Sequence, residues 1–183
     1  KKSHFIKITR SVDYLTDLLD DVITINKVDS GRLEVKYSKY DVVEMIKQLI
    51  NELKESYVDS PSISIKSSSN IIEARVDEKL FRQIISNLVS NAIKYTSPNK
   101  KIEVNLFEKE NHFIFEIRDE GVGIPVESQK ELFTPFYRAS NIGNVPGSGL
   151  GLAITKRSID LMKGQIEFTS QQNEGTTFKV ILP

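Results

Sequence analysis

The 183-residue chain has no cysteine, which excludes disulfides and thiolate metal sites and fits a reducing compartment. It also lacks any apolar run near the roughly 18 residues of a membrane-spanning helix. Neither charge dominates, because Lys and Arg total 25 and Asp and Glu total 25. A general attraction to nucleic acid is therefore not expected. No signal-peptide pattern opens the chain, so we expect a cytoplasmic location.

Apolar residues recur at steps of three and four between residues 5 and 26, the spacing of a coiled-coil or bundle helix. The stripe consists of Phe5, Ile8, Val12, Leu15, Leu19 and Val22. So narrow a stripe needs a partner helix, which we expect upstream or on another chain. Gly31 supplies a helix stop. We therefore predict two regions, a long helix over 1–30 and a domain over 31–183, within a longer protein.

Short alternating runs and helical patterns are mixed beyond residue 31. Helices are predicted over 42–56, 78–95 and 149–162, with Asp41 and Asp77 as caps for the first two. Strands are predicted over 33–37, 63–65, 72–76, 102–107, 113–117, 165–169 and 177–182. Because these runs do not repeat as βαβ units, we expect an α+β two-layer sandwich, with a mixed sheet and helices on one face.

The predicted helix over 78–95 has one polar side that carries almost no charge. This side consists of Gln83, Ser86, Asn87, Ser90, Asn91 and Lys94. A solvated surface would carry charge, yet Gln83–Ile93 has none, where the overall 27% would give about 3. Amide oxygens followed by a lysine suit Mg²⁺ and a phosphate chain. A plain solvated face stays the alternative.

Two glycine-rich turns follow. In Asp119-Glu-Gly121-Val-Gly123-Ile124 the glycines allow close approach of a flat ligand, and Asp119 can accept a hydrogen bond from an exocyclic amine or simply cap its own turn. Gly147-Ser148-Gly149-Leu150-Gly151-Leu152 opens a helix whose free N–H groups favour phosphate, unless the segment is only a hinge. The spacing matches neither a dinucleotide fingerprint nor a Walker loop.

Together and in this order, these segments resemble the sensor histidine kinases of two-component systems. Asn87-Leu-Val-Ser-Asn91-Ala-Ile-Lys94-Tyr95 is similar to their N box, and the two glycine turns to their G1 and G2 boxes. Phe133-Thr-Pro-Phe136-Tyr-Arg138 is similar to the F box, and Glu174-Gly-Thr-Thr177-Phe178 to the usual last strand. The resemblance covers residues 1–183, with 1–30 as the second helix of the dimerisation hairpin.

The resemblance implies a Bergerat-type ATP-binding fold with ATP and Mg²⁺ as cofactors. Asn91 would ligate Mg²⁺, Asp119 would hold the adenine amine, and Asn87, Lys94 and Arg138 would act in catalysis near the phosphates. Residues 126–148 would form a lid with Phe133 and Phe136 packed at its base, although core packing alone could also explain these rings. The implied ATP-binding residues are Asn87, Asn91, Lys94, Tyr95, Asp119, Gly121, Gly123, Ile124, Phe136, Gly147, Ser148, Gly149, Leu150, Gly151, Leu152 and Thr177.

The resemblance also implies transfer of the γ-phosphate to a histidine on an upstream dimerisation helix, for relay to the aspartate of a response-regulator receiver domain. The protein would be a homodimer, and either free in the cytoplasm or the cytosolic part of a membrane-anchored sensor. His4 lacks the acidic residue and proline that follow the family's acceptor, so we expect it to be an ordinary helix residue. The alternatives are a GHKL-type ATPase of the gyrase and Hsp90 kind and a nucleotide-gated interaction module.

Overall fold

The computed structural model describes residues 19, 22, 23, 34–57, 59–143, 145 and 147–183. The chain divides into two compact units, Lys1–Glu34 and Val35–Pro183. Most of the stripe predicted over 5–26, and His4, lie outside the described residues, so the function of the first region stays a prediction. Leu19, Val22 and Ile23 are helical and exposed.

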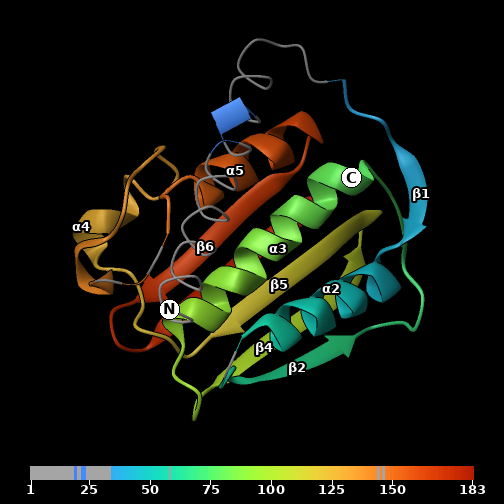
Figure 1. The fold of residues 1–183 in the computed structure, drawn as a ribbon. Helices are drawn as coiled ribbons and strands as arrows, with labels where there is room; N and C mark the ends of the chain where they lie inside the picture. Colours follow the sequence, from blue (N-terminus) through green and yellow to red (C-terminus); the bar gives the residue numbers. More distant parts are fainter. Residues whose placement is uncertain (1–18, 20–21, 24–33, 58, 144, 146) are drawn as a thin grey trace, which may run out of the picture. The chain divides into compact units, whose positions relative to one another are not determined.

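A five-stranded mixed sheet forms the second unit, in the order β2-β4-β5-β7-β6 (Figure 1). Its strands are β2 (Ser62–Ser67), β4 (Lys101–Lys109), β5 (His112–Asp119), β6 (Gln165–Gln171) and β7 (Gly175–Leu182). β2 runs parallel to β4, and the other neighbours are antiparallel. β1 (Ser38–Asp41) and β3 (Glu73–Val76) form a separate antiparallel pair.

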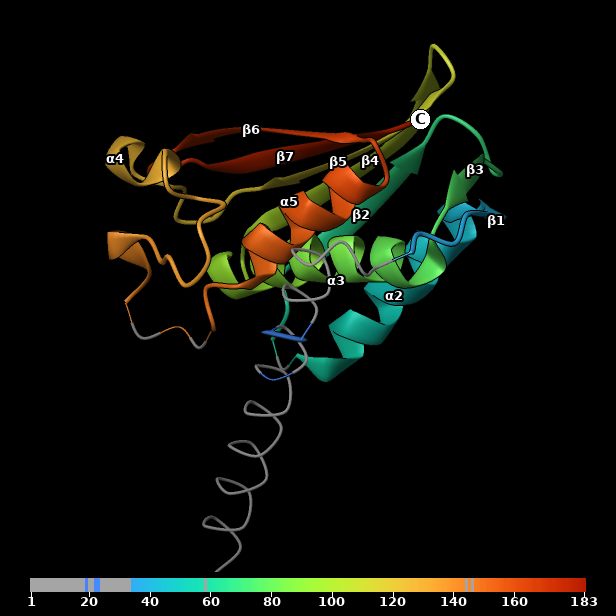
Figure 2. The same ribbon diagram turned by 90° about the horizontal axis from the view of Figure 1, so that it is seen from above.

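Three helices cover one face of this sheet: α2 (Val42–Ser56), α3 (Glu78–Tyr95) and α5 (Gly151–Leu161) (Figure 2). The core lies between the two layers, where alternate residues of β5 such as Phe115 and Ile117 are buried. The rings of Phe81 on α3 and Phe113 on β5 lie 6.0 Å apart. The predicted two-layer α+β sandwich with a mixed sheet is therefore confirmed.

Aspartate caps fix the starts of two helices, as the sequence predicts. Asp41 Oδ1 accepts a hydrogen bond from the N–H of Val43 at 3.1 Å, and Asp77 Oδ1 accepts one from the N–H of Leu80 at 3.1 Å. Each carboxylate satisfies a backbone donor that has no partner within the helix. The apolar side of α3 is buried as expected, through Phe81, Ile84, Ile85, Leu88, Val89 and Ala92.

Two predicted boundaries are wrong. The strand expected over 33–37 begins only at Ser38. Its position is set by pairing with β3, in which Ser38 faces Val76 and Asp41 faces Glu73, and not by the alternation of apolar residues. The helix expected from residue 149 begins at Gly151, because Gly149 has a left-handed backbone (φ +73°) that a right-handed helix does not accept. The segment between β5 and α5 holds two short helices, α4 (Val126–Gln129) and η1 (Ser140–Ile142).

In the part of the chain that the structure describes, every helix is too short or too polar to cross a membrane.

Candidate functional site

The polar side of α3 faces the start of α5. Asn87 Nδ2 donates a hydrogen bond to the carbonyl oxygen of Gly151 at 3.0 Å and a second to Thr155 Oγ1 at 3.4 Å. Asn87 and Asn91 are half-buried, whereas Lys94 at the end of the helix is exposed. This burial argues against a plain solvated face, and the bond to Gly151 places the Asn87 amide beside the second glycine turn.

Asn91 is suited to hold a divalent metal ion. It lies one helical turn beyond Asn87, and within the described residues its side chain has no hydrogen-bond partner. Among those same residues, no group of three or more His, Asp or Glu could hold a metal. A lone amide oxygen fits Mg²⁺, which keeps several waters and shares the phosphates of its nucleotide.

Asp119 ends β5 and is buried, with an exposed fraction of 8%. Burial raises the pKa of its carboxyl to about 6, although the N–H groups of Gly121 and Thr176 and the charge of Lys100 act in the opposite direction. One of its oxygens accepts the Gly121 N–H at 2.8 Å, so Asp119 does cap its own turn. The hydrogen bonds and the nearby positive charge do not fully offset the cost of burying this carboxylate. A further hydrogen-bond donor, such as an amine of a ligand, would stabilise its charged form.

The first glycine turn is packed between the end of α3 and the connection of β6 to β7. A Cβ on Gly121 would lie 2.6 Å from the carbonyl oxygen of Tyr95, and one on Gly123, whose φ is +62°, would lie 2.0 Å from that of Gln171. The N–H of Val122 donates to the Tyr95 carbonyl at 3.2 Å. Neighbouring backbone therefore requires both glycines.

In the second glycine turn, two of the three glycines are not crowded by backbone. Among the described residues, a Cβ on Gly147 would meet nothing within 4 Å, and the atoms nearest to one on Gly151 would be those of the Asn87 amide, at 3.6 to 3.8 Å. Gly149 differs, because its Cβ would lie within 3.0 Å of the backbone of Phe136 and Tyr137. Buried Leu150 anchors this turn, and Ser148 Oγ accepts its N–H at 3.1 Å.

No side chain among the described residues caps the N-terminus of α5. Its first residues, Gly151 and Leu152, are half-buried and stand beside Asn87. Unsatisfied N–H groups and the helix dipole make such a start suitable for phosphate.

The two phenylalanines of the predicted lid differ. Phe133 packs edge-on against Phe168, with ring centroids 5.9 Å apart, as expected. The expected packing of Phe136 is wrong, because its side chain is 65% exposed. This residue is held by its backbone instead: φ is +65°, and its N–H donates to the Gly149 carbonyl at 3.0 Å.

Arg138 closes the loop that precedes the second glycine turn. Its guanidinium donates to the carbonyl oxygens of Gly147, at 3.2 Å, and of Val145. Burial raises the pKa of half-buried Tyr95, and the positive charge of Arg138 partly offsets this shift. The expectation that Arg138 reaches toward phosphate stays a prediction.

The structure does not bring Thr177 together with Asp119. Thr177 pairs with Arg118, on the sheet face away from the helices, whereas buried Thr176 pairs with Asp119. Side chains alternate along a strand, so counting back from buried Phe178 identifies Thr176 as the inward residue. Thr176 Oγ1 lies 2.9 Å from Ser170 Oγ, which accepts the N–H of Ile124 at 2.8 Å.

Two further residues were missed because no local pattern marks them. Thr155 holds the Asn87 amide from α5. Asn141 of η1 donates from Nδ2 to the carbonyl oxygen of Gly123 at 2.9 Å and so ties the segment between β5 and α5 to the first glycine turn. Both contacts join positions far apart in the sequence.

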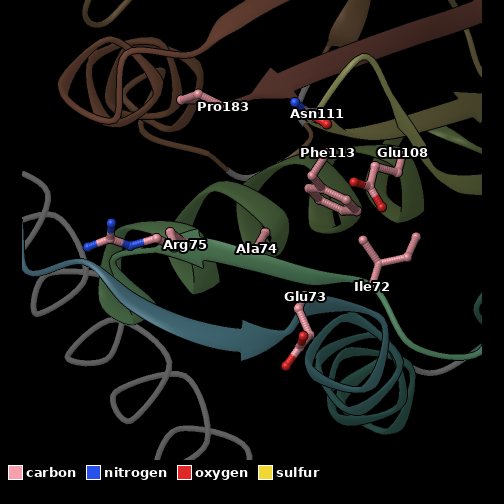
Figure 3. Close-up of a pocket in the computed structure, with 8 residues that line it drawn as sticks. All are labelled: Ile72, Glu73, Ala74, Arg75, Glu108, Asn111, Phe113 and Pro183. Atoms are coloured by element: carbon pink, nitrogen blue, oxygen red, sulfur yellow. The ribbon is translucent and has the colours of Figure 1, made fainter.

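A pocket of about 220 Å³ lies elsewhere, between β3 and the hairpin of β4 and β5 (Figure 3). Its lining residues are Ile72, Glu73, Ala74, Arg75, Glu108, Asn111, Phe113 and Pro183. Phe113 stands at the start of β5 and Asp119 at its end, about 20 Å apart along an extended strand. None of the predicted site residues lines this pocket.

Comparison with known proteins identifies relatives that match most of this chain. The chain is 36% identical over 180 residues to the heme sensor protein HssS of Staphylococcus haemolyticus (strain JCSC1435), covering 97% of this chain and 38% of HssS. It is 34% identical over 166 residues to the signal transduction histidine-protein kinase ArlS of Staphylococcus aureus (strain USA300), covering 90% of this chain and 37% of ArlS. The chain thus spans less than two-fifths of the length of these relatives.

A solved structure of full-length ShkA in complex with AMPPNP matches with a TM-score of 0.84 and 23% identity, over 100% of this chain and 38% of ShkA. At that identity the likeness shows the fold alone. Fold and relatives define the second unit as a catalytic ATP-binding domain of the sensor histidine kinase class. Residues 76–183 match the family described as histidine kinase-, DNA gyrase B-, and HSP90-like ATPase, and the chain belongs to it.

Proposed function

We propose that this domain binds Mg²⁺-ATP and transfers its γ-phosphate to a histidine on an upstream dimerisation helix. The full protein would be a homodimer joined through a helical hairpin, to which residues 1–30 contribute the second helix. The phosphoryl group would then pass to the aspartate of a response-regulator receiver domain. The observation that carries the proposal is the pairing of the Asn87 and Asn91 side of α3 with the uncapped start of α5.

Asp119 would hold the adenine end of the nucleotide. Its buried carboxylate would accept a hydrogen bond from the exocyclic amine, while the N–H groups of Gly121 and Thr176 keep the carboxylate oriented. Tyr95 and Ile124, both half-buried near this turn, would line the base. Because the carboxyl is buried, water competes poorly for it, so this single contact can select adenine.

The phosphates would lie between α3 and the start of α5. The N–H groups of Gly151 and Leu152 would donate to them, and the absence of a Cβ on Gly147 and Gly151 would allow close approach. The side-chain oxygen of Asn91 would hold Mg²⁺, which supplies positive charge against the phosphate oxygens. Lys94 and Arg138 would add further positive charge as the transferred group separates.

Transfer would form a bond between a histidine ring nitrogen and the γ-phosphorus and break the bond from that phosphorus to the bridging oxygen, leaving ADP. Asn87 favours this outcome over hydrolysis. The gyrase and Hsp90 type of ATPase carries a glutamate at the matching place, whereas an amide cannot take a proton from water.

The decisive experiment mixes this chain with a segment that carries the upstream hairpin helix and with [γ-³²P]ATP. Acid-labile, base-stable label on that helix is the expected result. Nucleotide binding without label would instead indicate a nucleotide-gated interaction module, and steady release of phosphate without label would indicate an ATPase.

Asn91→Ala should abolish the label while the domain stays folded, because the half-buried amide has no structural partner in the described part of the chain. Asn51→Ala on the exposed side of α2 is the matched control and should keep wild-type labelling. Full transfer by Asn91→Ala would contradict the assignment of Asn91 to Mg²⁺.

A further inference from the structure

We propose that Thr155 is a positioning residue that holds the Asn87 amide in one orientation, with its oxygen turned toward the bound nucleotide. This inference rests on the proposed function and adds a residue to it. Thr155 lies on α5 one turn after Gly151, and its side chain is fully buried. No atom of Thr155 needs to touch the nucleotide for this role.

The orientation of the amide follows from its neighbours. The Gly151 carbonyl can only accept a hydrogen bond, so the Asn87 atom that faces it at 3.0 Å must be Nδ2. The second hydrogen of Nδ2 is directed to Thr155 Oγ1 at 3.4 Å. Both donor positions of the amide are therefore used by α5.

The oxygen of the same amide is left without a partner among the described residues. This oxygen can therefore accept a hydrogen bond from a ligand bound between α3 and α5, or coordinate a metal ion there. An acceptor oxygen attracts a metal ion or its bound water and repels a phosphate oxygen. Asn87 thus joins Asn91 on the metal side of the site, and Thr155 keeps it from turning its NH₂ group toward the ligand.

Thr155→Val removes the hydroxyl while keeping the shape of the side chain. Binding of AMPPNP, a non-hydrolysable ATP analogue, is measured by calorimetric titration at a series of Mg²⁺ concentrations. With Mg²⁺, the affinity of Thr155→Val should be about threefold to tenfold below that of wild type, the range for one hydrogen bond. Without metal, in EDTA, the affinity should stay within about twofold of wild type. Thr155→Ser keeps the hydroxyl and should restore the Mg²⁺-dependent affinity.

Ser158→Ala is the matched control. Ser158 is also fully buried on α5, but its hydroxyl has no hydrogen-bond partner in the described part of the chain. Its removal should change neither titration.

Three results would overturn the role of Thr155. In the first, Thr155→Val binds AMPPNP with the Mg²⁺ dependence of wild type. In the second, its affinity for AMPPNP falls by the same factor with and without metal, which indicates that Thr155 acts through packing alone. The third result comes from a ¹⁵N spectrum of the wild type, so it does not depend on whether a variant folds. There, the side-chain N–H groups of Asn87 would exchange with water as fast as those of Asn91. If the wild type binds no nucleotide at all, the proposed function itself fails and this inference fails with it.

Discussion

The glycine turns at 119–124 and 147–152 look alike in sequence but differ in what surrounds them. In the first turn, a Cβ on Gly121 or Gly123 would collide with the backbone of Tyr95 or Gln171. In the second, Gly147 and Gly151 face open space or a single amide, and only Gly149 is confined by backbone. The fold thus explains the glycines of the first turn, whereas the folded chain alone gives no steric reason for two glycines of the second.

This difference separates two uses of glycine. Where backbone crowds the position, glycine is needed for the domain to fold and carries little information about ligands. Where no backbone crowds the position, two physical reasons remain, close approach of a bound group to the backbone and the flexibility of a hinge. The second turn is therefore the one at which a ligand can account for the glycines, and substitutions should separate the two turns.

The largest effect is expected for Gly123→Ala. The new Cβ would lie 2.0 Å from the Gln171 carbonyl oxygen at a φ of +62°, so both backbone strain and a collision oppose it. We expect a loss of roughly 4 kcal/mol or more in the free energy of unfolding, measured by denaturant titration.

Two controls divide that loss into its causes. Gly143→Ala also has a positive φ, +53°, but its Cβ would meet none of the described residues within 4 Å, so it should cost only about 1–3 kcal/mol of strain. Gly147→Ala has neither feature and should leave the free energy of unfolding within about 0.5 kcal/mol of wild type. Equal losses in all three variants would contradict the steric explanation.

A smaller effect, dependent on pH, is expected at Asp119, since the first turn contains a buried carboxyl and the second contains none. Its pKa rises from 3.8 to about 6 on folding, so the folded state holds this proton more tightly than the unfolded state. The stability from the protonated form is complete below pH 4 and is lost as the pH rises through about 6.

Asp119→Asn removes this titration. Without nucleotide, the free energy of unfolding of wild type minus that of Asp119→Asn should fall by about 2–3 kcal/mol between pH 4 and pH 7. Denaturant unfolding of both proteins at each pH measures it, and groups common to both cancel. A difference that is flat with pH would show that burial does not raise this pKa.

An effect on stability as small as that of Gly147→Ala is expected for Gly151→Ala. Its Cβ would make an ordinary contact with the Asn87 amide, at 3.6 Å, so the free energy of unfolding should change by less than about 0.5 kcal/mol. Its affinity for Mg²⁺-ATP should nevertheless fall about tenfold, because the methyl group occupies space beside the start of α5. Wild-type affinity would contradict close approach of phosphate at this glycine.

Much of the fold could be predicted because its signals are local. The aspartates at 41 and 77 cap helices within three residues of themselves, and the apolar spacing of α3 identified its buried side. Strand β1 was misplaced since its position depends on pairing with β3, more than thirty residues away. The outward Phe136 was missed for a similar reason, because a backbone bond to Gly149 holds it.

For the site, the order of the motifs was sufficient to predict which segments meet, but not which atoms meet. The choice between Thr176 and Thr177 depends on strand register against β5, and the choice of Asn87 oxygen or nitrogen depends on α5. Both are set by segments that are distant in the sequence.

The amino-acid sequence by itself determined the helix caps, the buried side of α3, the family and the candidate amides, since capping and periodicity act over a few neighbouring residues. Only the tertiary structure decided which glycines are confined, which threonine accompanies Asp119 and how the Asn87 amide is turned. The physical reason is that steric exclusion and hydrogen-bond direction arise where residues such as Asn87 and Thr155, 68 positions apart, are packed against each other.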